Sequence, residues 1–244
     1  MHAAKKHLKT REVKYFIAGN GITKSSEYMA EMQNNHAEGE TSIIHGLSSM
    51  YVRQKHVTVY GNDSDLFALL LMHYKSIDCN ELYMKSHSGY TSITAVYNFL
   101  GHDVATAVLS LHALTGCDTI GKFSGKSKEF WTGKFLSERS NVSLIQALNH
   151  LQQEQSEEVV NEVAQFACRT YCPKNTPKHI TNSIVETRYF LCKKFSADTN
   201  KLPPTVGAFT QHVKRASCQL LVWISAHMSE IAKPDLLIYG WEKW

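Results

Sequence analysis

The sequence lacks the features that mark membrane proteins, secreted proteins and disulfide scaffolds. Its longest apolar run, Leu66–Met72, is far shorter than the ~20 residues that cross a bilayer. The first residues, Met-His-Ala-Ala-Lys-Lys, lead into polar sequence without the apolar stretch of a signal peptide. Six cysteines in 244 residues are sparse and irregularly spaced. We therefore expect an intracellular protein, of the nucleus or the cytoplasm, with no membrane partner.

A strong excess of one charge is also absent. The chain has 26 Lys and Arg against 22 Asp and Glu, a formal net charge of +4, which permits a nucleic-acid partner without requiring one. Hydrophobic residues make up 43% and charged residues 20%, an ordinary globular composition that argues against disorder. The length allows one large domain, or a core with a smaller partner.

Strands and helices alternate in the first part of the chain. Short β-rich runs predict strands, and apolar residues at helical spacing predict helices between them. Ser64 or Asp65 is the expected N-cap of the second helix. This alternation with short turns predicts an α/β fold, a parallel sheet flanked by helices. The expected strands are Val13–Ala18, Val57–Tyr60 and Leu82–Lys85, and the expected helices start near Glu40 and span Leu66–Tyr74, Ser92–Leu100 and Asp103–Leu114.

From about Phe135 the pattern becomes mostly α-helical. Leu144, Ile145, Leu148 and Leu151 form one helical stripe. Ser156 precedes two glutamates and is an expected helix cap. Further helices are expected around Ile184–Phe195 and over Val206–Met228. We divide the chain into a core, residues 1–135, and a helical extension, residues 136–244.

Three acidic clusters lie at expected element ends: Glu38-Gly39-Glu40, Asp63-Ser64-Asp65, and Asp118 after a helix. In open α/β sheets, ligands gather outside the carboxyl ends of the strands, so these carboxylates could meet there. Like charges at short range are costly, and a hard divalent cation relieves that cost. Carboxylates without His or Cys favour Mg²⁺ or Mn²⁺ over Zn²⁺. The alternative is that these residues only cap helices.

Three motifs, in this order, resemble the nuclease core of the PIN-like and flap-endonuclease superfamily. They are His36-Ala37-Glu38-Gly39-Glu40-Thr41, then Asn62-Asp63-Ser64-Asp65-Leu66, then His112-Ala113-Leu114-Thr115-Gly116-Cys117-Asp118-Thr119. The resemblance is closer still to uncharacterised, transposon-associated animal proteins with E-A-D, D-x-D and L-T-G-C-D motifs. It extends to Gly125-Lys126-Ser127-Lys128 and to a tail with Leu202-Pro203-Pro204-Thr205, His212, Arg215, Trp223 and Tyr239-Gly240-Trp241.

This resemblance implies a metal-dependent nuclease that hydrolyses DNA or RNA phosphodiesters. Glu38, Glu40, Asp63, Asp65 and Asp118 would hold one or two Mg or Mn ions. Asp63, Asp65 and Asp118 would be the catalytic carboxylates. The nucleic-acid backbone would be bound by Lys122, Lys126 and Lys128.

The sequence departs from the superfamily pattern at its front. Ala37 and Gly39 replace the Glu and Ala usual in the closer group, and the strand Val13–Ala18 ends in Gly-Asn-Gly where the superfamily carries an Asp. We therefore expect a PIN-like core that is truncated at its N-terminus, with an open sheet edge. The alternatives to an active nuclease are a catalytically inactive PIN-like binding module and a decayed mobile-element fragment.

Other motifs carry weaker signals. The loop Gly121–Ser127 has one residue too few between its glycines for an ATP-binding phosphate loop. Cys168 and Cys172 could suggest zinc, but buried packing is the better interpretation. For Phe123, Phe130 and Trp131, core packing is favoured over stacking on bases. The 13 histidines show no spacing motif.

Overall fold

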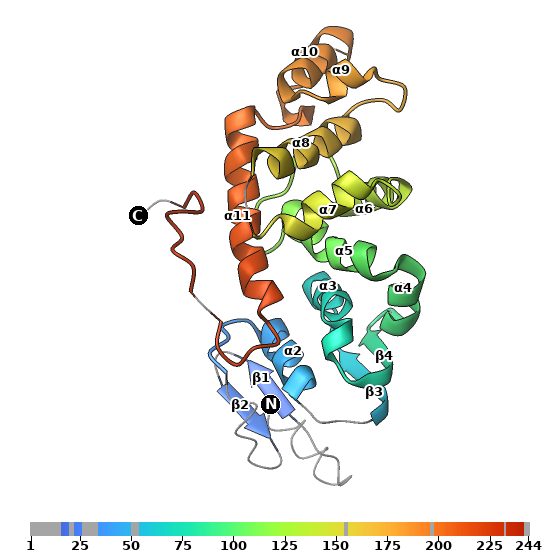
Figure 1. Cartoon of the computed structure of the whole chain (residues 1–244), viewed down its shortest axis with the longest axis vertical. Helices are drawn as coiled ribbons and strands as arrows, with labels where there is room; N and C mark the ends of the chain where they lie inside the picture. Colours follow the sequence, from blue (N-terminus) through green and yellow to red (C-terminus); the bar gives the residue numbers. More distant parts are fainter. Residues whose placement is uncertain are drawn as a thin grey trace. The chain divides into compact units, whose positions relative to one another are not determined.

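The computed structural model describes residues 16–19, 22–25, 34–49, 54–153, 156–195, 198–231 and 233–241 (Figure 1). Its regular elements combine short strands with many helices. In chain order they are β1 (Phe16–Gly19), β2 (Ile22–Ser25), α2 (Gly39–Ser49), β3 (Gln54–Tyr60), α3 (Ser64–Met72), η2 (Tyr74–Ser76), β4 (Cys79–Ser86), β5 (Gly89–Ser92), α4 (Ile93–Leu100), α5 (His102–Leu114), α6 (Lys128–Ser137), α7 (Val142–His150), α8 (Glu157–Tyr171), α9 (Lys178–Thr181), α10 (Ile184–Phe195), η3 (Thr199–Lys201) and α11 (Val206–Ile224).

The chain forms two compact units. The first unit comprises Met1–Thr94 and Val222–Lys233, and the second comprises Ala95–Leu221 and Pro234–Trp244. The first unit therefore includes a segment from near the C-terminus. The domain boundary that the sequence suggested, near residue 135, lies within the second unit.

A small mixed sheet lies in the first unit, in the order β3-β4-β5. β3 and β4 pair in parallel from Gln54 opposite Cys79 to Tyr60 opposite Lys85, which confirms the expected parallel pair and the α/β class. The sheet is not purely parallel, because β4 turns back into β5 and the two pair antiparallel. Gly89, with φ +134°, permits this hairpin. β5 was not expected from the sequence, because its run is only four residues long.

The N-terminal strand differs from the expectation. Residues 16–18 lie in β1, whereas residues 13–15 of the expected strand lie outside the described residues. β1 pairs antiparallel with β2 in a separate two-stranded sheet, so the interpretation of Val13–Ala18 as a strand of the parallel sheet is wrong. Among the described residues, β3 pairs only with β4, which leaves the other edge of β3 without a described partner strand.

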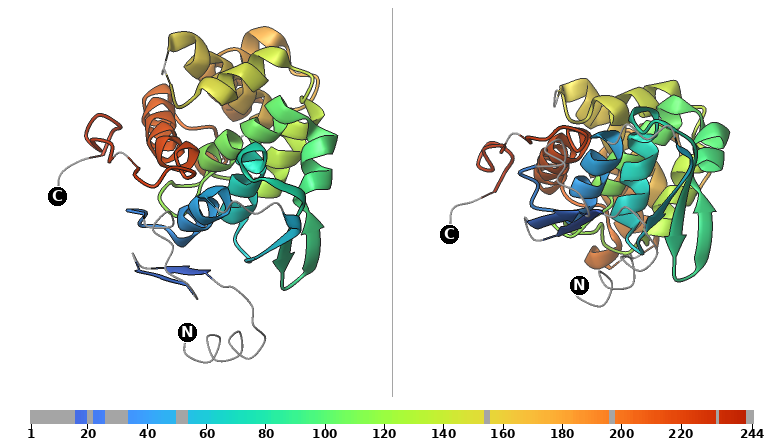
Figure 2. Two further views of the ribbon diagram at one scale, coloured as in Figure 1. Left: turned by 60° about the horizontal axis from the view of Figure 1, so that its bottom comes forward. Right: turned by 90° about the horizontal axis from the view of Figure 1, so that it is seen from below.

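The core of the first unit lies where α2 and α3 pack side by side (Figure 2). Ile44 of α2 is fully buried, as are the consecutive residues Leu69, Leu70 and Leu71 of α3. Leu82 of β4 is also fully buried, and its backbone N–H donates to Thr94 Oγ1 at 2.8 Å. A helix that is apolar on nearly all sides fits this surrounded position.

The second unit is helical, as the sequence predicted for the region after residue 135. α5 packs on α7 and α7 on α8, and α9 and α10 follow on α8 (Figure 1). Its centre is an aromatic cluster in which the Trp131 ring lies 5.0 Å from Phe123 and 5.7 Å from Phe166. Ser156 caps α8, as expected. α6 was not expected; Ser127 caps it by accepting a hydrogen bond from Phe130 N–H.

No helix formed by the described residues is both long and apolar enough to span a membrane. All six cysteines are free thiols.

Candidate functional site

Asp63 and Asp65 lie just beyond the carboxyl end of β3. The carboxylate of Asp63 caps α3, because its Oδ1 accepts a hydrogen bond from Asp65 N–H at 3.0 Å while its backbone is extended. The expectation that Ser64 or Asp65 is the cap is therefore wrong: α3 begins at Ser64, two residues before its apolar pattern begins at Leu66. Asp63 is exposed and Asp65 is half-buried in the first turn of α3. The cap uses one carboxylate oxygen of Asp63.

Two neighbours of the Asp63 cap hold this strand end in place. Gly61 N–H donates to Lys85 O at 3.1 Å and so extends the β3–β4 ladder. An added Cβ at Gly61 would collide with the end of the Leu66 side chain, which would have to shift. Asn62 Oδ1 accepts a hydrogen bond from His87 N–H at 2.8 Å, which ties the ends of β3 and β4 together. The carboxyl edge of the parallel pair is thus a rigid support for the two aspartates.

Glu38 and Glu40 lie at the start of α2, as the sequence predicted. Both side chains are half-buried. Glu38 is fixed by a residue far away in sequence: its Oε2 accepts a hydrogen bond from the indole Nε1–H of Trp223 at 2.9 Å. The backbone carbonyl of Glu38 also accepts hydrogen bonds from the side chains of Thr41 and Ser42. Four of the five predicted carboxylates therefore lie in the first unit.

Residues 223–231, which we call the C-terminal return, bind the segment that carries the first acidic motif. The side chain of Asn35 bonds both backbone groups of Ile231, donating to its O at 3.3 Å and accepting from its N–H at 2.9 Å. Asn35 N–H donates to Ser229 O. With the bond from Trp223 to Glu38, these contacts make the C-terminal return part of the structure around Glu38.

Three buried histidines hold the same C-terminal return. Each donates a ring N–H to a backbone carbonyl: His36 to Met228 O at 2.8 Å, His45 to His227 O at 3.1 Å and His73 to Trp223 O at 2.9 Å. Burial lowers the pKa of His36, and lowers that of His73 to about 4. The imidazoles of His36 and His73 are therefore neutral near pH 7. This grouping has no signature in the sequence, because the three histidines are scattered along the chain.

Asp118 lies in the second unit, in the loop after α5. It is exposed at the tip of a tight turn in which Cys117 and Ile120 exchange two backbone hydrogen bonds of 3.1 Å. Gly116, with φ +109°, lets the backbone of Lys122 approach closely, since an added Cβ would lie 3.1 Å from Lys122 Cα. Thr119 Oγ1 donates to Gln219 Oε1 of α11 at 2.8 Å, which anchors the turn. The loop therefore presents the Asp118 carboxylate to solvent.

The three predicted phosphate-binding lysines differ in their surroundings. Lys122 is exposed. Lys126 is half-buried, with Nζ 4.3 Å from the centre of the Phe130 ring, and burial lowers its pKa. Lys128 donates to His112 Nε2 at 3.1 Å and begins α6. Lys122 is thus the lysine of the three with its side chain most open to solvent.

The predicted ligands are divided between the two units. Glu38, Glu40, Asp63 and Asp65 belong to the first, and Asp118 with the three lysines belongs to the second. Within the described ranges, no group of three or more His, Cys, Asp and Glu is placed so that it could hold a metal ion. The convergence of these carboxylates on Mg²⁺ or Mn²⁺ therefore stays a prediction.

The burial of the aromatic residues near the lysines and of two cysteines tests two weaker hypotheses from the sequence. Phe123 and Trp131 are buried, which confirms core packing, whereas Phe130 is 49% exposed. Cys168 and Cys172 are buried in the second unit, as the packing interpretation expected, and burial raises the pKa of the Cys168 thiol to about 11.

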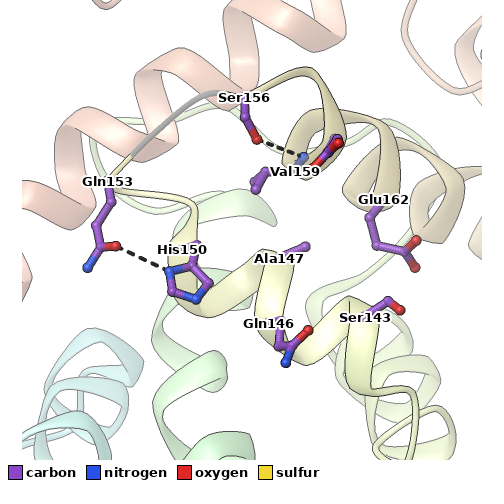
Figure 3. A pocket seen from close by; sticks show the side chains of 9 residues that line it. Ser143, Gln146, Ala147, His150, Gln153, Ser156, Val159 and Glu162 are labelled. Carbon is purple, nitrogen blue, oxygen red and sulfur yellow. Dashed lines mark hydrogen bonds between the residues drawn. The ribbon is translucent and has the colours of Figure 1, made fainter.

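A pocket of about 680 Å³ lies in the second unit between α7 and α8 (Figure 3). Its polar lining is already engaged in local structure: His150 Nδ1 bonds Gln153 Oε1 at 3.2 Å, and Ser156 caps α8. Glu162, also in the lining, contacts Arg169 at 3.5 Å. None of the predicted site residues lines this pocket, so it supports no role in the candidate site.

Comparison with known proteins identified no matching family model, curated protein or solved structure.

Proposed function

We propose that this chain is a PIN-like, metal-dependent nuclease domain that hydrolyses DNA or RNA phosphodiesters. The observation that carries the proposal is the position of Asp63 and Asp65 at the carboxyl edge of the parallel β3–β4 pair. This is the edge at which ligands bind in open α/β sheets. The class of reaction comes from the three motifs, which resemble those of PIN-like nucleases and of transposon-associated animal proteins.

The donor chemistry fits a hard divalent cation. All five proposed ligands are carboxylates, the ligand type that Mg²⁺ and Mn²⁺ prefer. Asp63 accepts its capping hydrogen bond with one carboxylate oxygen, and Glu38 accepts the bond from Trp223 with one of its own. One or two ions held there would lower the pKa of a bound water and stabilise the negative charge on the leaving oxygen. The exposed Lys122, two residues beyond the Asp118 turn, would contact the phosphate backbone.

A second candidate is a catalytically inactive PIN-like module that still binds nucleic acid. The cap formed by Asp63 favours it, because helix capping alone accounts for an aspartate at this position. Under this alternative the chain binds its partner but does not cleave it.

The test is a cleavage assay with single-stranded and flapped DNA and RNA, with Mn²⁺ or with EDTA. We expect Mn²⁺-dependent cleavage that Asp118→Ala reduces on the order of 100-fold, as for loss of a group that stabilises the transition state. Asp103→Ala is the matched control, since Asp103 is another exposed aspartate of the second unit. No cleavage by the wild-type chain, or equal activity of both variants, would reject the nuclease proposal.

A further inference from the structure

Positive charge is concentrated in one part of the second unit. Residues 173–201, which we call the basic segment, hold six basic residues, namely Lys174, Lys178, Arg188, Lys193, Lys194 and Lys201, against Glu186 and Asp198. Their net charge of +4 equals the formal net charge of the whole chain. The rest of the chain therefore carries equal numbers of basic and acidic residues, and the excess lies around α9 and α10.

The fold turns most of this charge toward solvent. α10 buries Ile184, Thr187 and Leu191 on the side that faces its neighbours. Lys174, Lys178, Lys193 and Lys194 are exposed. Arg188 has a structural role, because its guanidinium donates to Pro203 O. Four lysines from α10, α9 and the turn before α9 thus lie at the surface.

Aromatic and apolar side chains share the exposed side of α10. Tyr189 is 61% exposed, and Val185, one helical turn before it, is 60% exposed. The ammonium of Lys193 lies 5.5 Å from the centre of the Tyr189 ring, and that of Lys194 lies 5.2 Å from the Phe190 ring. Lysines near a helix C-terminus also compensate the helix dipole, but that effect does not explain an exposed tyrosine beside them.

This combination suits a single-stranded nucleic acid. Lysines neutralise phosphates, and an exposed aromatic ring offers a face on which an unpaired base can stack. An acidic protein would be attracted by the lysines without need of the ring. A membrane surface would require a wider apolar face than Val185 and Tyr189 provide.

We propose that the basic segment binds single-stranded DNA or RNA, with Tyr189 stacking on a base and Lys178, Lys193 and Lys194 contacting phosphates. The proposal rests on the proposed function for its class of partner. It needs neither the metal ion nor the carboxylates, because all its contacts lie on α9 and α10. It would give the nuclease domain a surface that holds substrate.

The experiment measures fluorescence anisotropy of a labelled single-stranded oligonucleotide, DNA or RNA, with the full chain in EDTA between 50 and 200 mM salt. Lys193→Gln/Lys194→Gln should weaken binding and reduce the slope of log affinity against log salt by about 1.4, which is ~0.7 for each lost phosphate contact. Tyr189→Ala should weaken binding roughly 10-fold and leave the slope unchanged, because stacking releases no counterions.

The matched control is Lys75→Gln/Lys233→Gln, which removes the same charge from two exposed lysines of the first unit. Its slope should equal that of the wild type. The proposal is overturned by equal losses in the two double variants, by no wild-type binding, or by binding to phosphatidylserine vesicles but not to oligonucleotide. EDTA prevents cleavage, so the binding result does not depend on nuclease activity and stands even if the nuclease assay fails. If the wild-type chain cleaves nucleic acid but the α10 variants bind it as tightly as the wild type does, the proposed α10 surface is wrong and the proposed function is unaffected.

Discussion

The two units bury tryptophans in contrasting ways. Trp223 of the first unit and Trp131 of the second are each 1% exposed. The indole N–H of Trp223 donates to the Glu38 carboxylate. That of Trp131 has no hydrogen-bond partner among the described residues and lies within a cluster of aromatic rings.

This difference shows how each unit is held together. In the first, polar side chains of distant segments bond the C-terminal return to the helix that carries Glu38. In the second, apolar and aromatic side chains form the cluster around Trp131. Polar contacts at 2.8–3.1 Å specify orientation. Protonation of a buried histidine such as His73 is unfavourable, because burial disfavours the charged ring. Packing is insensitive to pH but sensitive to lost volume. The first unit should therefore respond to acid and to the loss of single polar atoms.

Acidification should give the largest effect. Burial lowers the pKa of His73 to about 4 from its usual 6.5. Between these values the unfolded chain binds a proton that the folded chain does not bind, so the contribution of His73 to stability falls as the pH drops from about 6.5 and levels off below about 4. This loss reaches about 3 kcal/mol at pH 4. Urea unfolding at pH 7 and at pH 4 measures it.

His73→Gln is the variant for this titration, because its amide N–H can still donate to Trp223 O but does not titrate. The difference in stability between pH 7 and pH 4 should be smaller than in the wild type by about 3 kcal/mol. Burial lowers the pKa of His36 and of His212 in the same direction, so some dependence should remain. An unchanged pH dependence would show that His73 is not held neutral.

The second-largest effect on stability is expected from replacing the two buried tryptophans, Trp223 and Trp131. Trp223→Phe and Trp131→Phe remove the same atoms from equally buried rings. Only the first breaks a hydrogen bond to a charged group, which is worth about 1.5–3 kcal/mol. Trp223→Phe should therefore destabilise the chain by about 2 kcal/mol more than Trp131→Phe in urea unfolding at pH 7. Equal losses would mean that the bond to Glu38 adds nothing to stability.

The smallest effect concerns Asp63 and separates its cap from its proposed metal role. Asp63→Asn keeps an N-cap and should change stability little, whereas Asp63→Ala should cost about 1 kcal/mol. Both should reduce any thermal stabilisation by Mn²⁺, because neither side chain carries the charge. Thermal melts with and without Mn²⁺ test this. Full Mn²⁺ stabilisation of Asp63→Asn would assign Asp63 to capping alone.

Local patterns predicted many of the elements correctly. Ser156 followed by two glutamates predicted the cap of α8, and the spacing of Leu144, Ile145 and Leu148 predicted α7. Such signals act over about one helical turn and need no knowledge of the rest of the fold. The cap of α3 was misplaced by one or two residues, because Asp63, Ser64 and Asp65 are all good caps and the end of β3 selects among them.

The candidate site was predicted as a set of residues but not as a structure. The placement of Glu38, Glu40, Asp63 and Asp65 at element ends follows from the alternation of strands and helices. The surroundings of the predicted lysines do not follow from the sequence pattern. The contact of Lys128 with His112 and that of Lys126 with Phe130 depend on where α6 packs.

The sequence by itself determined many of the helices and strands, though not α6 or β5, and it determined which carboxylates lie at element ends. Only the tertiary structure decided that Trp223 binds Glu38, that three scattered histidines hold the C-terminal return, and that β4 turns back into β5. The physical reason is range. Helical periodicity and caps involve residues a few positions apart, whereas His73 and Trp223 are separated by 150 positions and Asn35 and Ile231 by 196. Contacts of that kind depend on the packing of every element between them.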